Sequence, residues 1–155
     1  MQKHVLSQKD MREFKNKIKM LYNIDINANK IEIGKDKKRV FYFLDDVLCF
    51  FDDKLIPTLC FLQKNDINMP WVKIDEGAVK AIVRGADLYA PGVLESSGNL
   101  LPGSLIVVKA RQGQPVAVMM GTGEMIEALS SRKGRVATSL HWIGDEVWNM
   151  CKSKT

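Results

Sequence analysis

The sequence contains few of the residues that build metal centres and disulfide frameworks. Its 155 residues include three cysteines and two histidines, and no Cys-x-x-Cys pair occurs. The odd number and wide spacing of Cys49, Cys60 and Cys151 do not suggest a disulfide framework, and His4 and His141 are too few to complete a zinc site with them. We therefore expect reduced, partly buried thiols in a cytoplasmic protein, with no metal and no cofactor.

Long hydrophobic runs are also missing. No apolar stretch approaches the roughly 18 residues that a membrane-spanning helix needs, and the first residues lack the basic and apolar regions of a secretory signal. Hydrophobic residues make up 46% of the chain and charged residues 26%, which is typical of a globular protein. The sequence predicts a cytoplasmic location and no membrane partner.

Recognisable catalytic motifs are absent as well. The sequence has no glycine-rich phosphate-binding motif, and no nucleophile, base and orienting group stand in a familiar spacing. The acidic pair Asp75-Glu76 is explained by the start of a helix, where carboxylates accept hydrogen bonds from free N–H groups. We expect no catalytic residues and no enzymatic activity.

Positive charge is present in modest excess. The chain carries 23 Lys and Arg against 18 Asp and Glu, a net charge of +5. This excess suits an acidic partner such as RNA. Neither half of the chain is a polybasic arm, so RNA binding would depend on where the charges lie.

The first seventy residues predict an α+β unit, in which a helix precedes an antiparallel sheet. Ser7 has the character of a helix N-cap, and apolar residues follow it at helical spacing, namely Met11, Phe14, Ile18 and Leu21. A short strand is expected at residues 4–6, before this helix. After the helix, short apolar segments predict strands at residues 31–33, 40–44 and 47–51, and a further strand formed by residues 55–56 and 58–62 that is bent at Pro57. Turns are expected at residues 34–37, 45–46 and 52–54. The acidic turns suit turn formation better than a divalent ion.

The remaining residues predict a small β barrel with a few helices. Pro70 follows a polar stretch, and we place a domain boundary there, giving domains 1–70 and 71–155. Strands are expected at residues 71–74, 88–90, 105–108, 116–120 and 135–140, with Asp75 capping a helix that ends at Gly85. Residues 95–99 are expected as a loop, and residues 145–148 as a last short helix or turn.

Several motifs in this second part resemble the PUA domain, a small pseudo-barrel named for pseudouridine synthases and archaeosine transglycosylases. They are "VKIDEGAVKAIVRGADLYAPGV", "LLPGSLIVVK", "PVAVMMGTG" and "GRVATSLHWIGDEVW". The final "LHWIGDEVWNM" is similar to the end of the malignant T-cell-amplified protein and its archaeal relatives, which place one α+β domain before a PUA domain. The resemblance covers about half of the chain.

The resemblance implies an RNA-binding surface at the first helix and the glycine loop of the barrel. Carried over to this chain, the residues expected to contact RNA are Lys80, Arg84, Gly85, Ala86, Asp87, Leu88, Tyr89, Ala90, Pro91, Gly92 and Arg135. Lys80 and Arg84, spaced i and i+4, are expected to contact phosphates, and Tyr89 to stack on an unpaired base. Each has a structural alternative: Gly85 suits a helix C-terminus, Tyr89 a half-buried barrel position, and Arg135 a solvated turn.

The sequence is compatible with three functions. The first is a non-catalytic RNA-binding protein in translation that holds a tRNA acceptor end or ribosomal RNA, with the N-terminal domain docked on the small ribosomal subunit. The second is an adaptor for a partner with an initiation-factor-like domain, with the aromatic residues between Phe41 and Phe51 as a candidate surface. The third is an RNA-docking accessory subunit of a separate tRNA-modifying enzyme.

Overall fold

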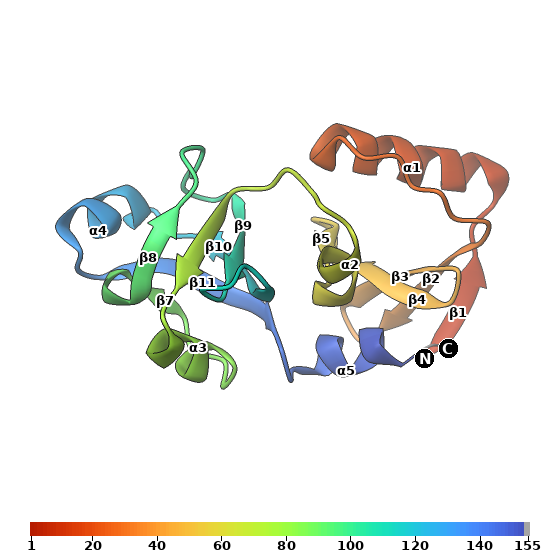
Figure 1. Cartoon of the computed structure of the whole chain (residues 1–155). Coiled ribbons are helices and arrows are strands. Elements are labelled where there is room, and N and C mark those ends of the chain that lie inside the picture. Colours follow the sequence, from red (N-terminus) through yellow and green to blue (C-terminus); the bar gives the residue numbers. More distant parts are fainter. Residues whose placement is uncertain (154–155) are drawn as a thin grey trace. The chain divides into compact units, whose positions relative to one another are not determined.

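The computed structural model describes residues 1–153, and these fold as two compact units. The first comprises Met1–Asn68 together with the segment from Asn149 onward, and the second comprises Met69–Trp148. Figure 1 shows that each unit has its own sheet and its own helices. The division lies beside Pro70, where we placed a boundary. The C-terminal segment, which we assigned to the second domain, groups with the first unit.

The first unit begins with strand β1 (Gln2–Val5) and helix α1 (Gln8–Tyr22). Ser7 caps α1, because its hydroxyl accepts a hydrogen bond from the Asp10 N–H at 3.1 Å. The buried side of α1 consists of Phe14, Ile18 and Tyr22, which are spaced four residues apart. Leu21, which we expected on this side, is 57% exposed.

The sheet of the first unit has five antiparallel strands in chain order. After β1 come β2 (Ile31–Asp36), β3 (Arg39–Leu44), β4 (Val47–Phe51) and β5 (Ile56–Pro57). The sequence predicts the antiparallel strands after α1, and β1, which precedes α1, joins them by pairing with β2. Asp45 and Asp46 both have positive φ in the turn before β4, as a tight hairpin requires. The Asp45 carboxylate accepts backbone N–H groups of Asn29 and Lys30, which confirms its structural role. The turn expected at residues 34–37 was placed too early, because β2 continues to Asp36.

The segment after β5 is a helix, which corrects the strand predicted at residues 58–62. Helix α2 (Leu59–Lys64) is capped by Thr58, whose hydroxyl accepts from the Phe61 N–H at 3.3 Å and donates to the Leu48 carbonyl at 3.0 Å. Its first four residues are all buried. A short, continuous apolar run carries no periodicity that separates a strand from a buried helix.

Aromatic side chains form the core of the first unit. Phe50 is fully buried and lies 4.8 Å from the ring of Phe61 and 5.9 Å from that of Phe14. Phe41, Phe43 and Phe51 are also at most 2% exposed. The aromatic segment that we considered as a partner surface is therefore core, and its burial stabilises α1 against the sheet.

The second unit is a six-stranded, barrel-like sheet in the order β7-β11-β10-β9-β6-β8. Its strands are β6 (Trp71–Ile74), β7 (Leu88–Tyr89), β8 (Val93–Ser96), β9 (Leu105–Lys109), β10 (Pro115–Gly121) and β11 (Arg135–Trp142). The two outer strands, β7 and β8, are joined by the single-turn helix η1 (Ala90–Gly92), which brings the sheet close to closure. The interior is aliphatic, and Ile74, Ile106 and Met119 are fully buried there.

Two helices, α3 (Glu76–Ile82) and α4 (Met125–Ser131), accompany this sheet. A third helix, α5 (Glu146–Lys152), begins in the second unit, and its residues from Asn149 onward belong to the first. The loop expected at residues 95–99 is in part wrong, because β8 continues through Ser96 and pairs with β6. Helix α4 was not predicted at all. Its N-cap position, Glu124, makes no side-chain capping hydrogen bond, so the usual sequence signal for a helix start is missing.

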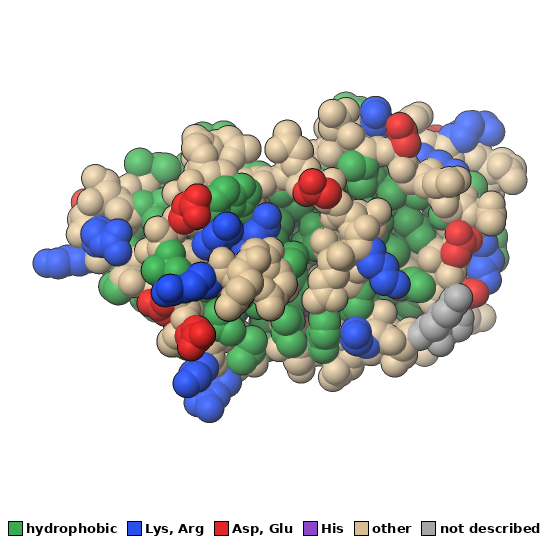
Figure 2. Space-filling view, viewed as in Figure 1, with side chains coloured by type: hydrophobic (Ala, Val, Ile, Leu, Met, Phe, Trp, Pro, Cys, Tyr) green, Lys and Arg blue, Asp and Glu red, His purple; other side chains and the backbone are tan. Residues whose placement is uncertain are grey.

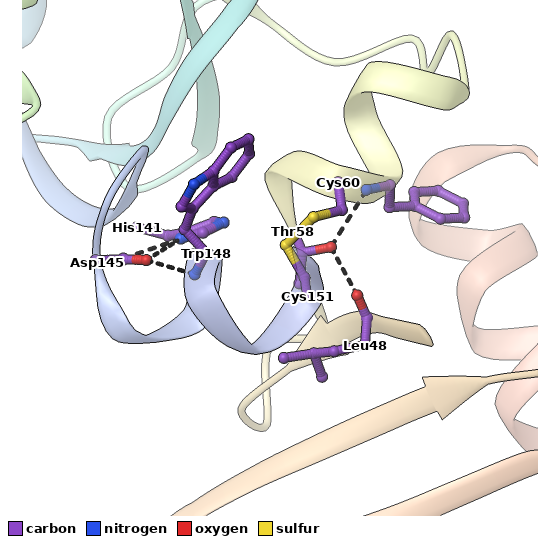
Figure 3. The surroundings of a disulfide bond; sticks show 8 residues. Leu48, Thr58, Cys60, His141, Asp145, Trp148 and Cys151 are labelled. Carbon is purple, nitrogen blue, oxygen red and sulfur yellow. Dashed lines mark hydrogen bonds and ion pairs between the residues drawn. A yellow bond between two sulfur atoms is a disulfide. The ribbon is translucent and has the colours of Figure 1, made fainter. Parts of the chain in front are cut away.

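The cysteines correct the expectation of reduced thiols. Cys60 of α2 and Cys151 of α5 form a disulfide (Figure 3). Cys49 remains a free, buried thiol. The bonded residues are 91 positions apart in the sequence. A pairing over this separation leaves no local spacing signal, which is why the sequence did not reveal it. Burial raises the pKa of the Cys49 thiol to about 11, despite smaller opposing influences from the Leu44 backbone and Lys64.

The start of α5 is fixed by a buried carboxylate. Asp145 accepts the backbone N–H of Trp148 and lies 2.9 Å from His141 Nδ1 (Figure 3). It also accepts the backbone N–H of Trp142. Burial acts to raise the pKa of Asp145, but the hydrogen bonds and the charge of His141 lower it below its usual value. His141 is fully buried, so this ion pair lies inside the protein.

Candidate nucleic-acid interface

Helix α3 is positioned by its acidic cap. Asp75 ends strand β6 and its carboxylate accepts the Ala78 N–H at 2.8 Å, so the predicted capping role is confirmed. Lys80 lies exposed in the last turn of α3. Arg84 is exposed too, but it follows the end of the helix in a turn whose N–H bonds to the Ala81 carbonyl. The two cations are therefore neighbours at the C-terminal end of α3 and not members of one continuous α-helical face.

Gly85 and Gly92, the glycines on either side of strand β7, are required by packing. Gly85 has φ +97°, and a Cβ atom added to it would lie 3.2 Å from Trp142 Cζ2. Gly92 has no positive φ, but an added Cβ would lie 2.7 Å from the Cβ of Ala78. Gly85 therefore permits both the turn after α3 and its contact with β11, and Gly92 permits η1 to pack against α3. Both glycines have a structural reason that is independent of any ligand.

Strand β7 turns one side chain outward and its neighbours inward. Leu88 and Ala90 are at most 2% exposed and belong to the barrel core. Tyr89 between them is 53% exposed. In the antiparallel pairing of β7 with β11, Arg135 is the partner of Tyr89. An exposed aromatic ring and a guanidinium group thus lie on adjacent strands.

Asp87 joins the glycine loop to β11. Its Oδ1 accepts the Ser139 N–H at 2.8 Å, and its Oδ2 lies 3.3 Å from the guanidinium of Arg135. The loop is held in place by these contacts, and part of the Arg135 charge is neutralised. Ser139 Oγ is buried without a hydrogen-bond partner in the part of the chain that the structure describes.

A small, open pocket lies between α3 and the segment from Asp87 to Gly92. Its volume is about 280 Å³. The apolar wall is formed by alanines of α3 together with Leu88 and Pro91, and Asp75 and Asp87 also line the pocket. Tyr89 lies at the same pocket. Figure 2 shows Lys and Arg side chains projecting near the end of α3 and acidic side chains close to them.

The structure brings most of the predicted site residues into one region. Asp87, Leu88, Tyr89, Pro91 and Gly92 line the pocket. The remaining ones surround it: Lys80 and Arg84 at the end of α3, Gly85 and the half-buried Ala86 in the following turn, Ala90 in the core, and Arg135 on β11. Two contributors were missed from the sequence. Ser139 and Trp142 are more than fifty residues away along the chain from their partners Asp87 and Gly85, and no local pattern marks them.

Residues 1–153 hold neither a metal-binding cluster nor a membrane-spanning helix. No group of three or more His, Cys, Asp or Glu side chains among them is arranged to hold a metal ion. Within the same range, no helix has both the length and the apolar character needed to cross a bilayer.

Comparisons with known proteins cover both units. A family described as PUA domain matches residues 70–136, and a family described as a domain of unknown function (DUF1947) matches residues 2–65. An uncharacterised protein of Methanocaldococcus jannaschii is 31% identical over 157 residues, which is 95% of each chain. Translation machinery-associated protein 20 of Saccharomyces cerevisiae is 31% identical over 134 residues, which is 78% of this chain and 72% of that protein.

A human relative and a solved structure agree with these matches. Human malignant T-cell-amplified sequence 2 is 31% identical over 100 residues, 61% of this chain and 54% of the relative. The structure of a conserved PUA domain protein from Thermoplasma acidophilum superposes with a TM-score of 0.83 at 28% identity, over 97% of this chain and 99% of that one.

Proposed function

This chain belongs to the family of translation machinery-associated protein 20 and the malignant T-cell-amplified proteins, and we propose that it is a non-catalytic RNA-binding protein acting in translation. The resemblance inferred from the sequence is confirmed at the level of the family, and the barrel-like second unit has the expected PUA fold. The proposed activity is binding alone, in the cytoplasm, without metal or cofactor.

The single observation that carries the proposal is the pocket beside α3. It joins an apolar wall, an exposed aromatic ring at Tyr89, and two exposed cations, Lys80 and Arg84, at the end of the same helix. An aromatic ring next to cations binds the two chemical parts of a nucleotide, since a base stacks on the ring and phosphates pair with the cations.

The charges of the pocket suggest which part of the nucleotide enters it. Asp75 and Asp87 would repel a phosphate placed inside the pocket. Their carboxylates accept hydrogen bonds, and exocyclic amino groups of cytosine and adenine are suitable donors. We therefore place a base in the pocket and its phosphates outside, at Lys80 and Arg84.

A structured RNA with a single-stranded end satisfies this arrangement. A base can enter a pocket only when it is unpaired, and the adjacent stem supplies phosphates for the surrounding cations. We propose a tRNA acceptor stem with its CCA tail, or a ribosomal RNA element of this shape. The first unit would then dock on the small ribosomal subunit or on a protein bound to it.

Fluorescence anisotropy tests the proposal directly. The protein is titrated onto a labelled acceptor-stem hairpin with and without the CCA tail, at several salt concentrations. Lys80→Glu with Arg84→Glu is compared with Lys9→Glu and Lys17→Glu, which make the same charge change at exposed positions of α1. We expect the wild-type protein to prefer the tailed hairpin. The α3 variant should weaken binding and reduce the salt slope by about 1–2, while the α1 variant should not.

Two results would overturn this placement of the site. Equal binding to both hairpins that salt abolishes would indicate only the general attraction of a protein with net charge +5. An equal loss of affinity in the α1 and α3 variants would show that total charge, and not the surface at α3, governs binding.

An adaptor function is the second candidate, and one observation favours it. Met20 and Leu21 at the end of α1 are 87% and 57% exposed, whereas large apolar side chains normally lie inside. Recovery of one protein partner from cell extract after nuclease treatment, abolished by Met20→Ser with Leu21→Ser, would support the adaptor. Loss of every recovered protein on nuclease treatment would argue for RNA.

A further inference from the structure

A tryptophan and two lysines meet on the outer face of the second unit, apart from the pocket. Strand alternation turns Val72 and Ile74 of β6 into the core, where both are fully buried, and leaves Trp71 and Lys73 on the other face. Lys73 Nζ lies 5.5 Å from the centre of the Trp71 ring, and Lys109 Nζ of β9 lies 5.4 Å from it. We call these three residues the Trp71 platform.

The sheet register forces the two lysines together. Strands β6 and β9 are parallel neighbours, and Lys73 is paired directly with Lys109. Like charges on paired positions repel each other. Glu95 of β8 offsets part of this repulsion, with a carboxylate 3.9 Å from Lys73 Nζ that is 61% exposed. Within residues 1–153, no carboxylate lies within ion-pair distance of Lys109.

A purely structural role explains this arrangement poorly. The backbone hydrogen bonds of β6 and β9 already join the strands. The backbone N–H of Trp71 donates to Ser97 Oγ at 2.9 Å. A partly exposed cation over an aromatic ring, as each of the two lysines is, contributes on the order of 1 kcal/mol. Among the described residues, the two adjacent ammonium groups have only one partial counter-charge, so a bound anion would reduce the repulsion between them.

We propose that the Trp71 platform is a second RNA contact, on which a base of a single-stranded segment stacks while Lys73 and Lys109 bind the neighbouring phosphates. Both ammonium groups lie near the limit of cation–π distance, and the lysine side chains are flexible. A base can therefore take a face of the ring while each lysine turns to a phosphate. Sequence-tolerant single-strand binding uses this combination of aromatic stacking and cations.

The position of the platform extends the proposed binding surface, and the inference rests on the proposed function. Strand β6 leads from Trp71 directly to Asp75, the cap of α3. Four residues of strand span about 13 Å. A single strand that places one base in the pocket can thus continue to the platform within the same unit. Figure 2 shows Lys and Arg side chains over the region where β6 and β9 lie in Figure 1.

The test compares RNAs that differ only in the length of the single strand. One hairpin carries a short tail, and the other carries a tail that is longer by about ten nucleotides. Affinities are measured by anisotropy for the wild type, Trp71→Ala, and Lys73→Gln with Lys109→Gln. The control is Lys9→Gln with Lys17→Gln on α1. The α3 variant, Lys80→Glu with Arg84→Glu, is measured in parallel.

The platform predicts a loss that depends on tail length. We expect Trp71→Ala to weaken binding of the long-tailed RNA by about tenfold and to leave the short-tailed RNA unaffected. The double lysine variant should reduce the salt slope for the long tail by about 1.4, which corresponds to two phosphates of a single strand. Because the lysines are on the surface, their replacement tests the platform even where Trp71→Ala disturbs folding.

The outcomes separate the platform from the function on which it rests. Unchanged affinity of the lysine variant for the long tail, with a weakened α3 variant, would reject the platform and leave the proposed function intact. A loss of equal size for both tails would also reject it. Wild-type binding to the short-tailed hairpin that is no tighter than binding to a hairpin without a tail would reject the proposed function itself.

Discussion

Breaking the disulfide between Cys60 and Cys151 should destabilise the first unit by several kcal/mol. A cross-link restricts the unfolded chain, and the effect grows with the length of the closed loop. The sequence separation is 91 residues, which corresponds to about 4.6 kcal/mol when the whole chain unfolds together. If Met69–Trp148 stays folded, only about ten free residues remain in the loop, and the figure falls to about 3 kcal/mol.

The assay is thermal unfolding with and without reductant. For a unit of this size, 1 kcal/mol shifts Tm by about 4–8 °C, so the smaller figure of about 3 kcal/mol should lower the transition of the first unit by roughly 12–24 °C. Cys60→Ala and Cys151→Ala should each give most of the effect of the double variant, since either one removes the bond. Cys49→Ala is the matched control, because it removes a buried thiol outside the bond.

A thiol count gives the result that would refute this reasoning. Under denaturing conditions without reductant, the bonded protein exposes one reactive thiol, that of Cys49. Three reactive thiols, together with a Tm that reductant does not change, would show that the cysteines are reduced, as the sequence led us to expect.

Two further predictions concern single side chains. Burial raises the pKa of Cys49 from 9.0 to about 11. The free energy of unfolding should therefore be unaffected by this thiol below pH 9 and should fall by about 2–3 kcal/mol as the pH rises from about 9 to 11. Denaturant unfolding at several pH values should show a smaller fall in this range for Cys49→Ala. Asp87→Asn should keep the acceptor for the Ser139 N–H while removing the negative charge that pairs with Arg135, so the salt slope of RNA binding should increase; an unchanged or smaller slope would contradict this.

Much of the fold follows from local patterns in the sequence. The helix cap at Ser7, the strands at residues 40–44 and 47–51, and the cap at Asp75 were predicted because side-chain chemistry and periodicity act over a few residues. Helix α2 was mistaken for a strand because all of its first four side chains are buried and no polar face reveals its period.

Long-range contacts were beyond what the sequence indicates. The disulfide joins residues 91 positions apart, and the hydrogen bond from the Ser139 N–H to Asp87 spans 52 positions. Both depend on how complete units fold. The prediction that Leu21 lies on the buried side of α1 was wrong for a related reason. Whether Leu21 or Tyr22 is buried depends on how α1 packs against the sheet.

The glycine motif shows why a predicted site needs the structure before its residues can be interpreted. Gly85 and Gly92 are required by contacts with Trp142 and Ala78, so any barrel with this packing would keep them whether or not it binds RNA. The fold does not require the side chains of Lys80, Arg84 or Tyr89 in this way, because all three lie exposed. Their presence beside the pocket is therefore informative about function, and their substitution tests binding with little effect on folding.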